Sequence, residues 1–235
     1  MLQHKGWDMH SPWKSELAFR LKFPKASNEK SPEEARGCLR EKTICFFGDS
    51  HTRHLFDAMN KLINATSEAA CDKQSNLCHG EVGMYVLLHY PSAFPDANLS
   101  SCTHLIFNYG QWPAAYTDEP VWSIERYERE TRHFFDNTLA TIAQEKKVFW
   151  MSSNPFPLTL AVVRSCPPTD WRFPHILKEY NTVAAVLARE RGIEVIDHFD
   201  MMFHLVDASY DAAHYTEPSG SALARLVLTR LCSSL

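Results

Sequence analysis

The apolar residues of the chain fall into short runs separated by longer segments with helical spacing. The first run, residues 43–47 (TICFF), is continuously apolar and rich in β-forming residues, which is typical of a strand covered on both faces. Gly48, Asp49 and Ser50 follow, and these are turn and helix-capping residue types. The next apolar positions recur at helical spacing: Leu55, Met59 and Leu62. The pattern predicts a strand, a tight turn and a helix that begins near Ser50.

The later runs predict four more strands, at residues 81–90, 102–108, 147–152 and 193–196. Helical spacing predicts helices at 121–144, at 174–191 before Gly192, and at 218–231. Residues 65–80 are predicted to form a loop, and residues 1–41 an irregular segment. Strands and helices in this order predict a three-layer α/β/α sandwich around a mostly parallel five-stranded sheet.

Size and charge are compatible with one domain and argue against some partners. With 235 residues and 45% hydrophobic content, the chain can bury one full core, so we expect an N-terminal extension at 1–40 and one domain at 41–235. The formal charge of −4, from 24 basic and 28 acidic residues, indicates no nucleic-acid footprint and no basic patch for a membrane surface. We therefore expect a small molecule or a glycan as partner. The sequence does not indicate an oligomeric state.

The sequence also carries signs of its compartment. No run of 18 apolar residues is present, so we expect no membrane segment, and the start MLQHKGW lacks the apolar core of a signal peptide. Asn64 and Asn98 each begin an acceptable glycosylation sequon. Of the seven cysteines, Cys71 and Cys78 flank a short polar loop and are candidates to pair, whereas Cys45 is expected to be a buried thiol. We favour the secretory pathway, in the Golgi lumen or outside the cell, over the cytoplasm.

Two segments far apart in the sequence carry candidate chemistry. Ser50 leaves the sheet at the carboxyl end of its strand, which is where open α/β sheets bind their ligands. Asp211 and His214 form the one Asp-x-x-His in the sequence, just before the last predicted helix. A carboxylate so placed can fix the tautomer of the imidazole, and the other ring nitrogen can then take a proton from a hydroxyl.

The motifs at 48–53 (GDSHTR) and 211–214 (DAAH) resemble those of the SGNH, or GDSL-type, hydrolase superfamily. Within it, the chain is most similar to the PC-esterase branch and its polysaccharide O-acetyltransferase relatives, over roughly residues 41–235. The resemblance implies a flavodoxin-like strand order. We expect no cofactor and no metal. The resemblance also implies a catalytic triad of Ser50, Asp211 and His214.

The segment 108–112 (NYGQW) looks like the Asn-x-Gly-x-Trp pattern of the family. The resemblance implies that Asn108 and the amide of Ser50 receive the oxyanion, and that Gly110 and Trp112 contribute to substrate binding. Where the superfamily has a glycine after the second strand, this chain has His89 and the residues that follow it. The oxyanion hole is therefore expected to use the Ser50 amide and Asn108 alone.

Other residues near the motifs have two interpretations. Arg53 is expected to orient Asp49 or to bind a polar substrate group, or else to form a surface salt bridge. Trp112, together with Tyr116 and Trp122, is suited to stack on a sugar ring or to cover the core. The spacing of His51 and His54 suits a metal, but no matching cluster is nearby, so we interpret them as ordinary polar residues.

The sequence therefore predicts a serine-dependent acyl-ester enzyme. The resemblance favours O-acetyl groups of carbohydrate as its substrates. Residue order does not distinguish an O-acetylesterase from an O-acetyltransferase, because the acyl acceptor depends on how water is excluded. The alternative is a noncatalytic glycan-binding or interaction module that retains the fold.

Overall fold

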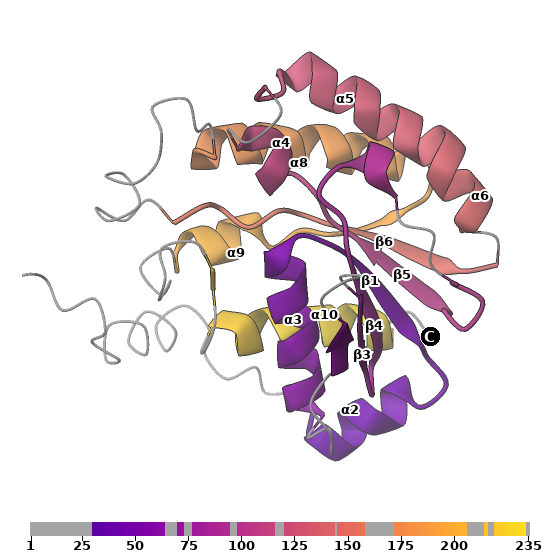
Figure 1. The fold of residues 1–235 in the computed structure, drawn as a ribbon. Helices are drawn as coiled ribbons and strands as arrows, with labels where there is room; N and C mark the ends of the chain where they lie inside the picture. The colour runs from indigo at the N-terminus through magenta and orange to yellow at the C-terminus, as the bar shows by residue number, and fades with distance from the viewer. Residues whose placement is uncertain are drawn as a thin grey trace, which may run out of the picture.

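The computed structural model describes residues 30–63, 70–72, 77–94, 98–115, 120–143, 145–157, 172–205, 214–215 and 219–233. Its centre is one seven-stranded sheet with the order β2-β3-β4-β1-β5-β6-β7. Figure 1 labels β3, β4, β1, β5 and β6 of this sheet. Five strands run parallel: β1 (Ile44–Gly48), β4 (Gly83–Leu87), β5 (His104–Phe107), β6 (Lys147–Met151) and β7 (Glu194–Ile196). In chain order these five follow the flavodoxin-like arrangement 2-1-3-4-5, so this prediction is confirmed.

The sheet has two more strands than predicted. β2 (Ala70–Asp72) and β3 (Leu77–Gly80) form an antiparallel hairpin beside β4, in a segment expected to be a loop. The residues of β2 are all exposed, so the hairpin lacks the apolar run by which the other strands were recognised. Cys71 lies opposite Cys78 in the register and is joined to it by a disulfide, which confirms that expected pair.

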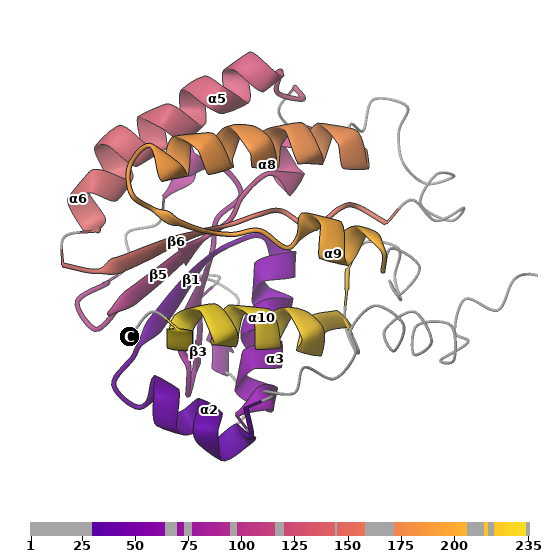
Figure 2. The same ribbon diagram turned by 180° about the vertical axis from the view of Figure 1, so that it is seen from behind.

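Helices cover both faces of the sheet, as Figures 1 and 2 show from opposite sides. The helices of one face are α2 (Pro32–Leu39), α3 (Ser50–Leu62) and α10 (Ser219–Ser233). The other face carries α4 (Gln111–Ala114), α8 (Pro174–Arg189) and a continuous helical stretch of α5 (Ile124–His133), the π-helical η2 (Phe134–Leu139) and α6 (Ala140–Ile142). Two short helices complete the described chain: η1 (Pro91–Ala93) and α9 (Phe199–Phe203). The predicted three-layer sandwich is therefore confirmed.

The core consists of two apolar layers, one on each face of the sheet. Alternate residues of a strand point to opposite faces, so Cys45 and Phe47 of β1 join the layer under α5 and α8. Ile44 and Phe46 join the layer under α3 and α10. Because both faces of β1 are buried, the strand reads as a continuous apolar run, and the turn after it is held in a fixed place.

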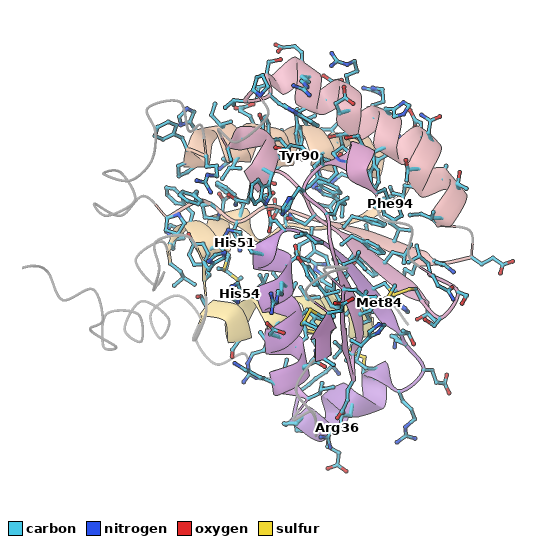
Figure 3. The ribbon with its side chains drawn as sticks, viewed as in Figure 1. Arg36, His51, His54, Met84, Tyr90 and Phe94 are labelled. Atoms are coloured by element: carbon cyan, nitrogen blue, oxygen red, sulfur yellow. A yellow bond between two sulfur atoms is a disulfide. The ribbon has the colours of Figure 1, made fainter. Side chains whose placement is uncertain are left out.

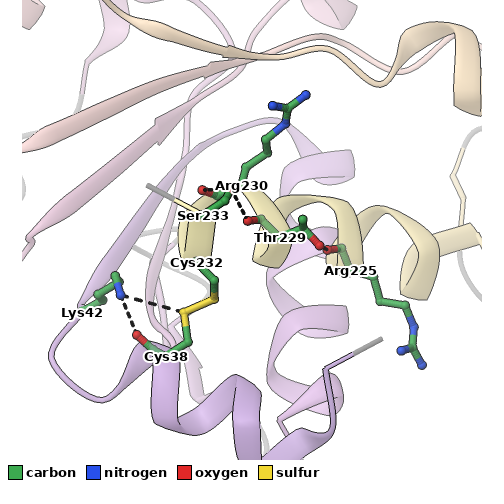
Figure 4. Close-up of a disulfide and its surroundings, with 7 residues drawn as sticks. All are labelled: Cys38, Lys42, Arg225, Thr229, Arg230, Cys232 and Ser233. Atoms are coloured by element: carbon green, nitrogen blue, oxygen red, sulfur yellow. Dashed lines mark hydrogen bonds between the residues drawn. A yellow bond between two sulfur atoms is a disulfide. The ribbon is translucent and has the colours of Figure 1, made fainter. Parts of the chain in front are cut away.

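The segment before β1 is more ordered than expected. Residues 1–41 were predicted to be irregular, but Ser31 and Glu34 form a capping box that starts α2. A disulfide joins Cys38 of α2 to Cys232 of α10, and Lys42 donates a 2.6 Å hydrogen bond to the Cys38 carbonyl (Figure 4). Part of the expected extension therefore packs against the domain.

The prediction for Cys45 was wrong. Cys45 was expected to be a buried thiol, but it forms a disulfide with Cys102, 57 positions later. Cys102 lies two residues before the first residue of β5. Both residues are buried in the layer under α5 and α8. Among the described residues, no helix combines the length and the apolar character needed to cross a bilayer.

Candidate active site

The turn between β1 and α3 presents Ser50 at the carboxyl edge of the sheet. Asp49 caps α3, since its Oδ1 accepts a 2.9 Å hydrogen bond from the amide of His51. A Cβ on Gly48 would lie 2.1 Å from Thr52 Oγ1 and 3.0 Å from the Asn108 carbonyl oxygen. No larger residue fits there without a shift, so glycine is what lets β1 enter the helix this sharply.

The capping carboxylate is itself unusual. Asp49 is 1% exposed, and its Oδ2 has no hydrogen-bond partner among the described residues. Burial raises the pKa of Asp49 to about 6, against the opposing effects of the His51 and Thr52 amides and the charges of His214 and Arg172. Below this carboxylate, Tyr85 donates from its hydroxyl to the carbonyl oxygens of Gly48 and Asp49 at 3.1 and 3.2 Å. The turn is therefore held from the sheet as well as from the helix.

The structure brings together Ser50 and His214, which are 164 positions apart. The His214 Nε2 lies 2.7 Å from the Ser50 Oγ, a normal distance for a hydrogen bond between a hydroxyl and an imidazole. Figure 3 labels His51 and His54 on the first turns of α3. The centroids of their rings lie 5.3 and 4.8 Å from that of His214. Asp211, the expected third member of the triad, lies outside the described residues.

Asn108 follows β5 at the same edge of the sheet and is buried. Its amide nitrogen donates to the Met151 carbonyl oxygen at 2.8 Å and to Ser153 Oγ at 3.3 Å. A Cβ on Gly110 would lie 2.4 Å from that same Ser153 Oγ, so this glycine makes room for the serine that Asn108 contacts. The oxyanion role of Asn108 and the substrate role of Gly110 stay predictions.

Aromatic rings follow the ends of the two strands that neighbour β1 in the sheet. The half-buried Trp112, in α4, stacks on His89, which follows β4, with ring centroids 3.9 Å apart and an angle of 27°. Burial lowers the pKa of His89, which favours a neutral ring in this stack. Trp122 is only 3% exposed and belongs to the core, so of the two interpretations it covers the core. Tyr116 lies outside the described residues.

Arg53 is exposed on α3, one turn after Ser50. Burial raises the pKa of Asp57, and the charge of Arg53 opposes this rise, followed by that of Lys61. The Arg53 side chain thus acts on a carboxylate of its own helix, while its proposed contact with substrate stays a prediction. Within the described part of the chain, no three or more His, Cys, Asp or Glu side chains are grouped to hold a metal ion.

One buried cluster escaped the sequence analysis. Ser152, Asn154 and His198 lie beyond the ends of β6 and β7 and are linked by hydrogen bonds to one another and to His51. The signal in the sequence was a run of polar residues, Ser-Ser-Asn, directly after an apolar strand. His198 gave no such signal, because it meets the others only once the strands are aligned.

No protein-family model matches the chain. One curated relative, the zebrafish (Danio rerio) protein N-acetylneuraminate (7)9-O-acetyltransferase, is 25% identical over 139 residues. The match covers 52% of this chain but only 17% of the relative, so the chain corresponds to a small part of that protein.

Several solved structures share the fold. A putative acylhydrolase from Bacteroides fragilis aligns with a TM-score of 0.58 at 14% identity, over 88% of this chain and 97% of that one. A GDSL-like lipase from Bacteroides thetaiotaomicron gives 0.56 at 14% identity, over 83% and 90%. A lipase/acylhydrolase from Enterococcus faecalis gives 0.53 at 15% identity, over 82% and 96%. The chain has the fold of the GDSL/SGNH lipases and acylhydrolases, as the sequence motifs implied.

Proposed function

We propose that this chain is a serine-dependent acyl-ester enzyme that acts on O-acetyl groups of carbohydrate. The observation that carries the proposal is the 2.7 Å distance between Ser50 Oγ and His214 Nε2. Within the fold of the acylhydrolases, this pair has the composition and geometry of an activated nucleophile and its base.

In the proposed reaction, Ser50 Oγ attacks the acetyl carbonyl carbon while His214 Nε2 takes the hydroxyl proton. The tetrahedral intermediate then collapses: the bond between the carbonyl carbon and the sugar oxygen breaks, and that oxygen takes the proton from His214. Acetyl-Ser50 remains. In the second half, a water or an acceptor hydroxyl gives its proton to His214 and attacks the acetyl carbon. The bond between that carbon and Ser50 Oγ then breaks, and Ser50 Oγ takes the proton back from His214, which restores the free serine.

The negative oxygen of the intermediate needs hydrogen-bond donors. The backbone amide of Ser50 stands at the start of α3, where amide groups have no partner within the helix. Asn108 is proposed as the second donor. Of its two hydrogen bonds, the one to Ser153 Oγ is longer, at 3.3 Å, and is the one we expect to be exchanged for the oxyanion.

Three features support a carbohydrate substrate. The name of the zebrafish relative specifies O-acetyl transfer on N-acetylneuraminate. The stacked Trp112 and His89 rings belong to the segments after β5 and β4, the two neighbours of β1, and such a stack is suited to pack against a sugar ring. Arg53 is exposed on α3, one helical turn after Ser50, so its guanidinium is suited to bind an anionic group of a sugar that reaches Ser50.

The test compares the parent with Ser50→Ala. We expect a fluorophosphonate to label the parent at Ser50, and the variant to lose at least about a thousandfold in hydrolysis of an aryl acetate. O-Acetylated N-acetylneuraminate, followed by mass spectrometry with and without an added acceptor glycan, separates esterase from transferase. Ser233→Ala, which changes an exposed serine of α10, is the matched control. A Ser50→Ala protein as active as the parent would contradict the proposal, and sugar binding without labelling would favour the noncatalytic module.

We further propose that the chain matures in the secretory pathway. Three disulfides among the described residues favour an oxidising compartment. Asn98 is exposed, as a glycan acceptor must be. On expression in animal cells, we expect a glycosidase to lower the mass of the protein, and Asn98→Gln to remove at least part of that shift. A protein recovered with reduced cysteines and no glycan would contradict this location.

A further inference from the structure

The buried cluster beyond β6 and β7 is a chain of hydrogen bonds that ends beside the proposed base. Ser152 Oγ lies 3.1 Å from His198 Nδ1, and His198 Nε2 lies 2.6 Å from Asn154 Oδ1. Asn154 Nδ2 then lies 3.2 Å from His51 Nδ1. All four residues are buried, and the most exposed of them, His51, is 8% exposed. The proposed reaction uses none of them.

The chemistry of the amide fixes the direction of each bond. Asn154 Oδ1 can only accept, so His198 Nε2 carries a hydrogen. Burial lowers the pKa of His198 to about 4, so the ring is neutral and its Nδ1 accepts from the Ser152 hydroxyl. The Asn154 amide nitrogen can only donate, so His51 Nδ1 accepts and the His51 hydrogen is on Nε2. A protonated His51 would turn an N–H toward another N–H and lose this bond.

The charge on His51 matters because of where the ring lies. Its centroid is 5.3 Å from that of His214 and 6.1 Å from that of Tyr215. When His214 takes the proton of Ser50, its ring becomes positive, and a second positive ring at this distance would oppose that step.

Other charged or titratable groups face the same region. The ring of His54, on the same helix, has its centroid 4.8 Å from that of His214. Asp49 lies at the start of that helix, and the charges of His214 and Arg172 both act on its carboxylate. His198 comes from the segment after β7. Of the titratable groups named here, His51 and His198 belong to the hydrogen-bonded chain.

We propose that Ser152, His198 and Asn154 hold His51 as a neutral imidazole against His214, which makes His51 and Asn154 positioning residues for the base. The inference rests on the proposed function, because it assigns the cluster to the same reaction. It also explains why a histidine follows the nucleophile without becoming a competing base: its acceptor nitrogen is already occupied.

The first test measures the tautomer directly in the intact protein. Histidine nitrogen NMR, with His51 assigned by His51→Gln, is expected to show a neutral ring with hydrogen on Nε2 from pH 6 to 8. Hydrogen on Nδ1, or a charged ring at pH 7, would overturn the inference. This measurement needs no activity, so it decides the matter even if Ser50 proves not to be catalytic.

The second test charges the ring through its partner. Asn154→Asp supplies a carboxylate that favours a protonated His51, and we expect kcat to fall at least about tenfold at neutral pH with KM within about twofold. Adding His51→Gln to this variant removes the charged ring and is expected to recover at least about threefold of the lost kcat without reaching the parent value, because the neutral ring that positions His214 is missing. Asn137→Asp is the matched control, since it makes the same change beside His133, 3.0 Å away on an exposed helix.

The outcomes separate the two proposals. If Ser50→Ala is inactive and folded Asn154→Asp has the kcat of the parent across this pH range, the inference about His51 fails and the proposed function stands. If Ser50→Ala is fully active, the proposed function fails, and the NMR result alone decides the state of His51. If Asn154→Asp does not fold, the NMR measurement on the parent again decides.

Discussion

The carboxyl ends of the parallel strands and the region where α2 leads into β1 are held together by different forces. The carboxyl ends bury polar groups, among them Asp49, Asn108 and His198, and join them by directional hydrogen bonds. Around α2, apolar residues such as Ala35 and Leu39 pack in the core, and a disulfide closes the contact with α10. Directional hydrogen bonds position reacting groups, but burying their polar atoms costs free energy of folding. Covalent and apolar contacts add stability. We expect substitutions at the two places to separate rate from stability.

The largest effect is expected on the rate of the reaction, from a substitution at the carboxyl ends of the parallel strands. His214→Gln removes the base that contacts Ser50 but keeps a polar side chain of similar size. We expect kcat/KM for an aryl acetate to fall about a thousandfold, because general-base catalysis supplies a contribution of this order. The free energy of unfolding, measured with urea, should change by less than about 1 kcal/mol, because the contact between His214 and Ser50 is only partly buried. A large loss of stability with little loss of rate would break the comparison.

At the α2 end, the reverse is expected. Cys38→Ser together with Cys232→Ser opens a loop of 194 residues in the unfolded chain. The free energy of unfolding should fall by about 5 kcal/mol, because the unfolded state regains the entropy that the cross-link removed. Urea denaturation without reductant measures this, and kcat/KM should stay within about twofold of the parent. A fall in kcat/KM comparable to that of His214→Gln would mean that α2 and α10 also position the site.

The smallest effect is expected in how the stability of the protein depends on pH, through the buried carboxylate of Asp49. The pKa of Asp49 is raised from its ordinary value of 3.8 to about 6, so the folded protein binds this proton more tightly than the unfolded chain. Stability from this group is therefore present at low pH and is lost as pH rises from about 4 to about 6, by roughly 3 kcal/mol.

Asp49→Asn should remove this slope. Asparagine keeps an oxygen that can accept from the His51 amide but has no charge to bury. We expect the variant to be more stable than the parent at pH 7 by about 2 kcal/mol and about equal to it at pH 4. Glu34→Gln, in the exposed capping box of α2, is the control, because the pKa of Glu34 is lowered by its bonds to Ser31 and its pH dependence has the opposite sign. Equal slopes in the parent and Asp49→Asn would show that the carboxylate is not a buried charge.

The strands that the sequence predicted most clearly are those with a largely apolar run. β1 is buried throughout, and the last three residues of β5 and of β6 are buried, so their runs stand out, and the polar residues after them locate the edge where the site forms. The hairpin of β2 and β3 lacked this signal because β2 is short and exposed. The capping box at Ser31 and Glu34 was readable as a helix start but was taken for part of an irregular segment.

Contacts between distant segments were predictable only where a motif marked both partners. Ser50 and His214 each carried such a motif, and the structure places them in contact. Cys45 and Cys102 did not, since pairing among seven cysteines cannot be deduced from spacing. The cluster of Ser152, Asn154 and His198 also depends on strand alignment, which no local pattern encodes.

The lengths of the two outermost strands have a consequence for solubility. β2 and β7, which border the sheet, are three residues long, whereas the inner strands run to four or five. A short border offers few open backbone groups to which a strand from another molecule can add. The protein can therefore keep a wide, strongly apolar interior without presenting a template for edge-to-edge aggregation at high local concentration.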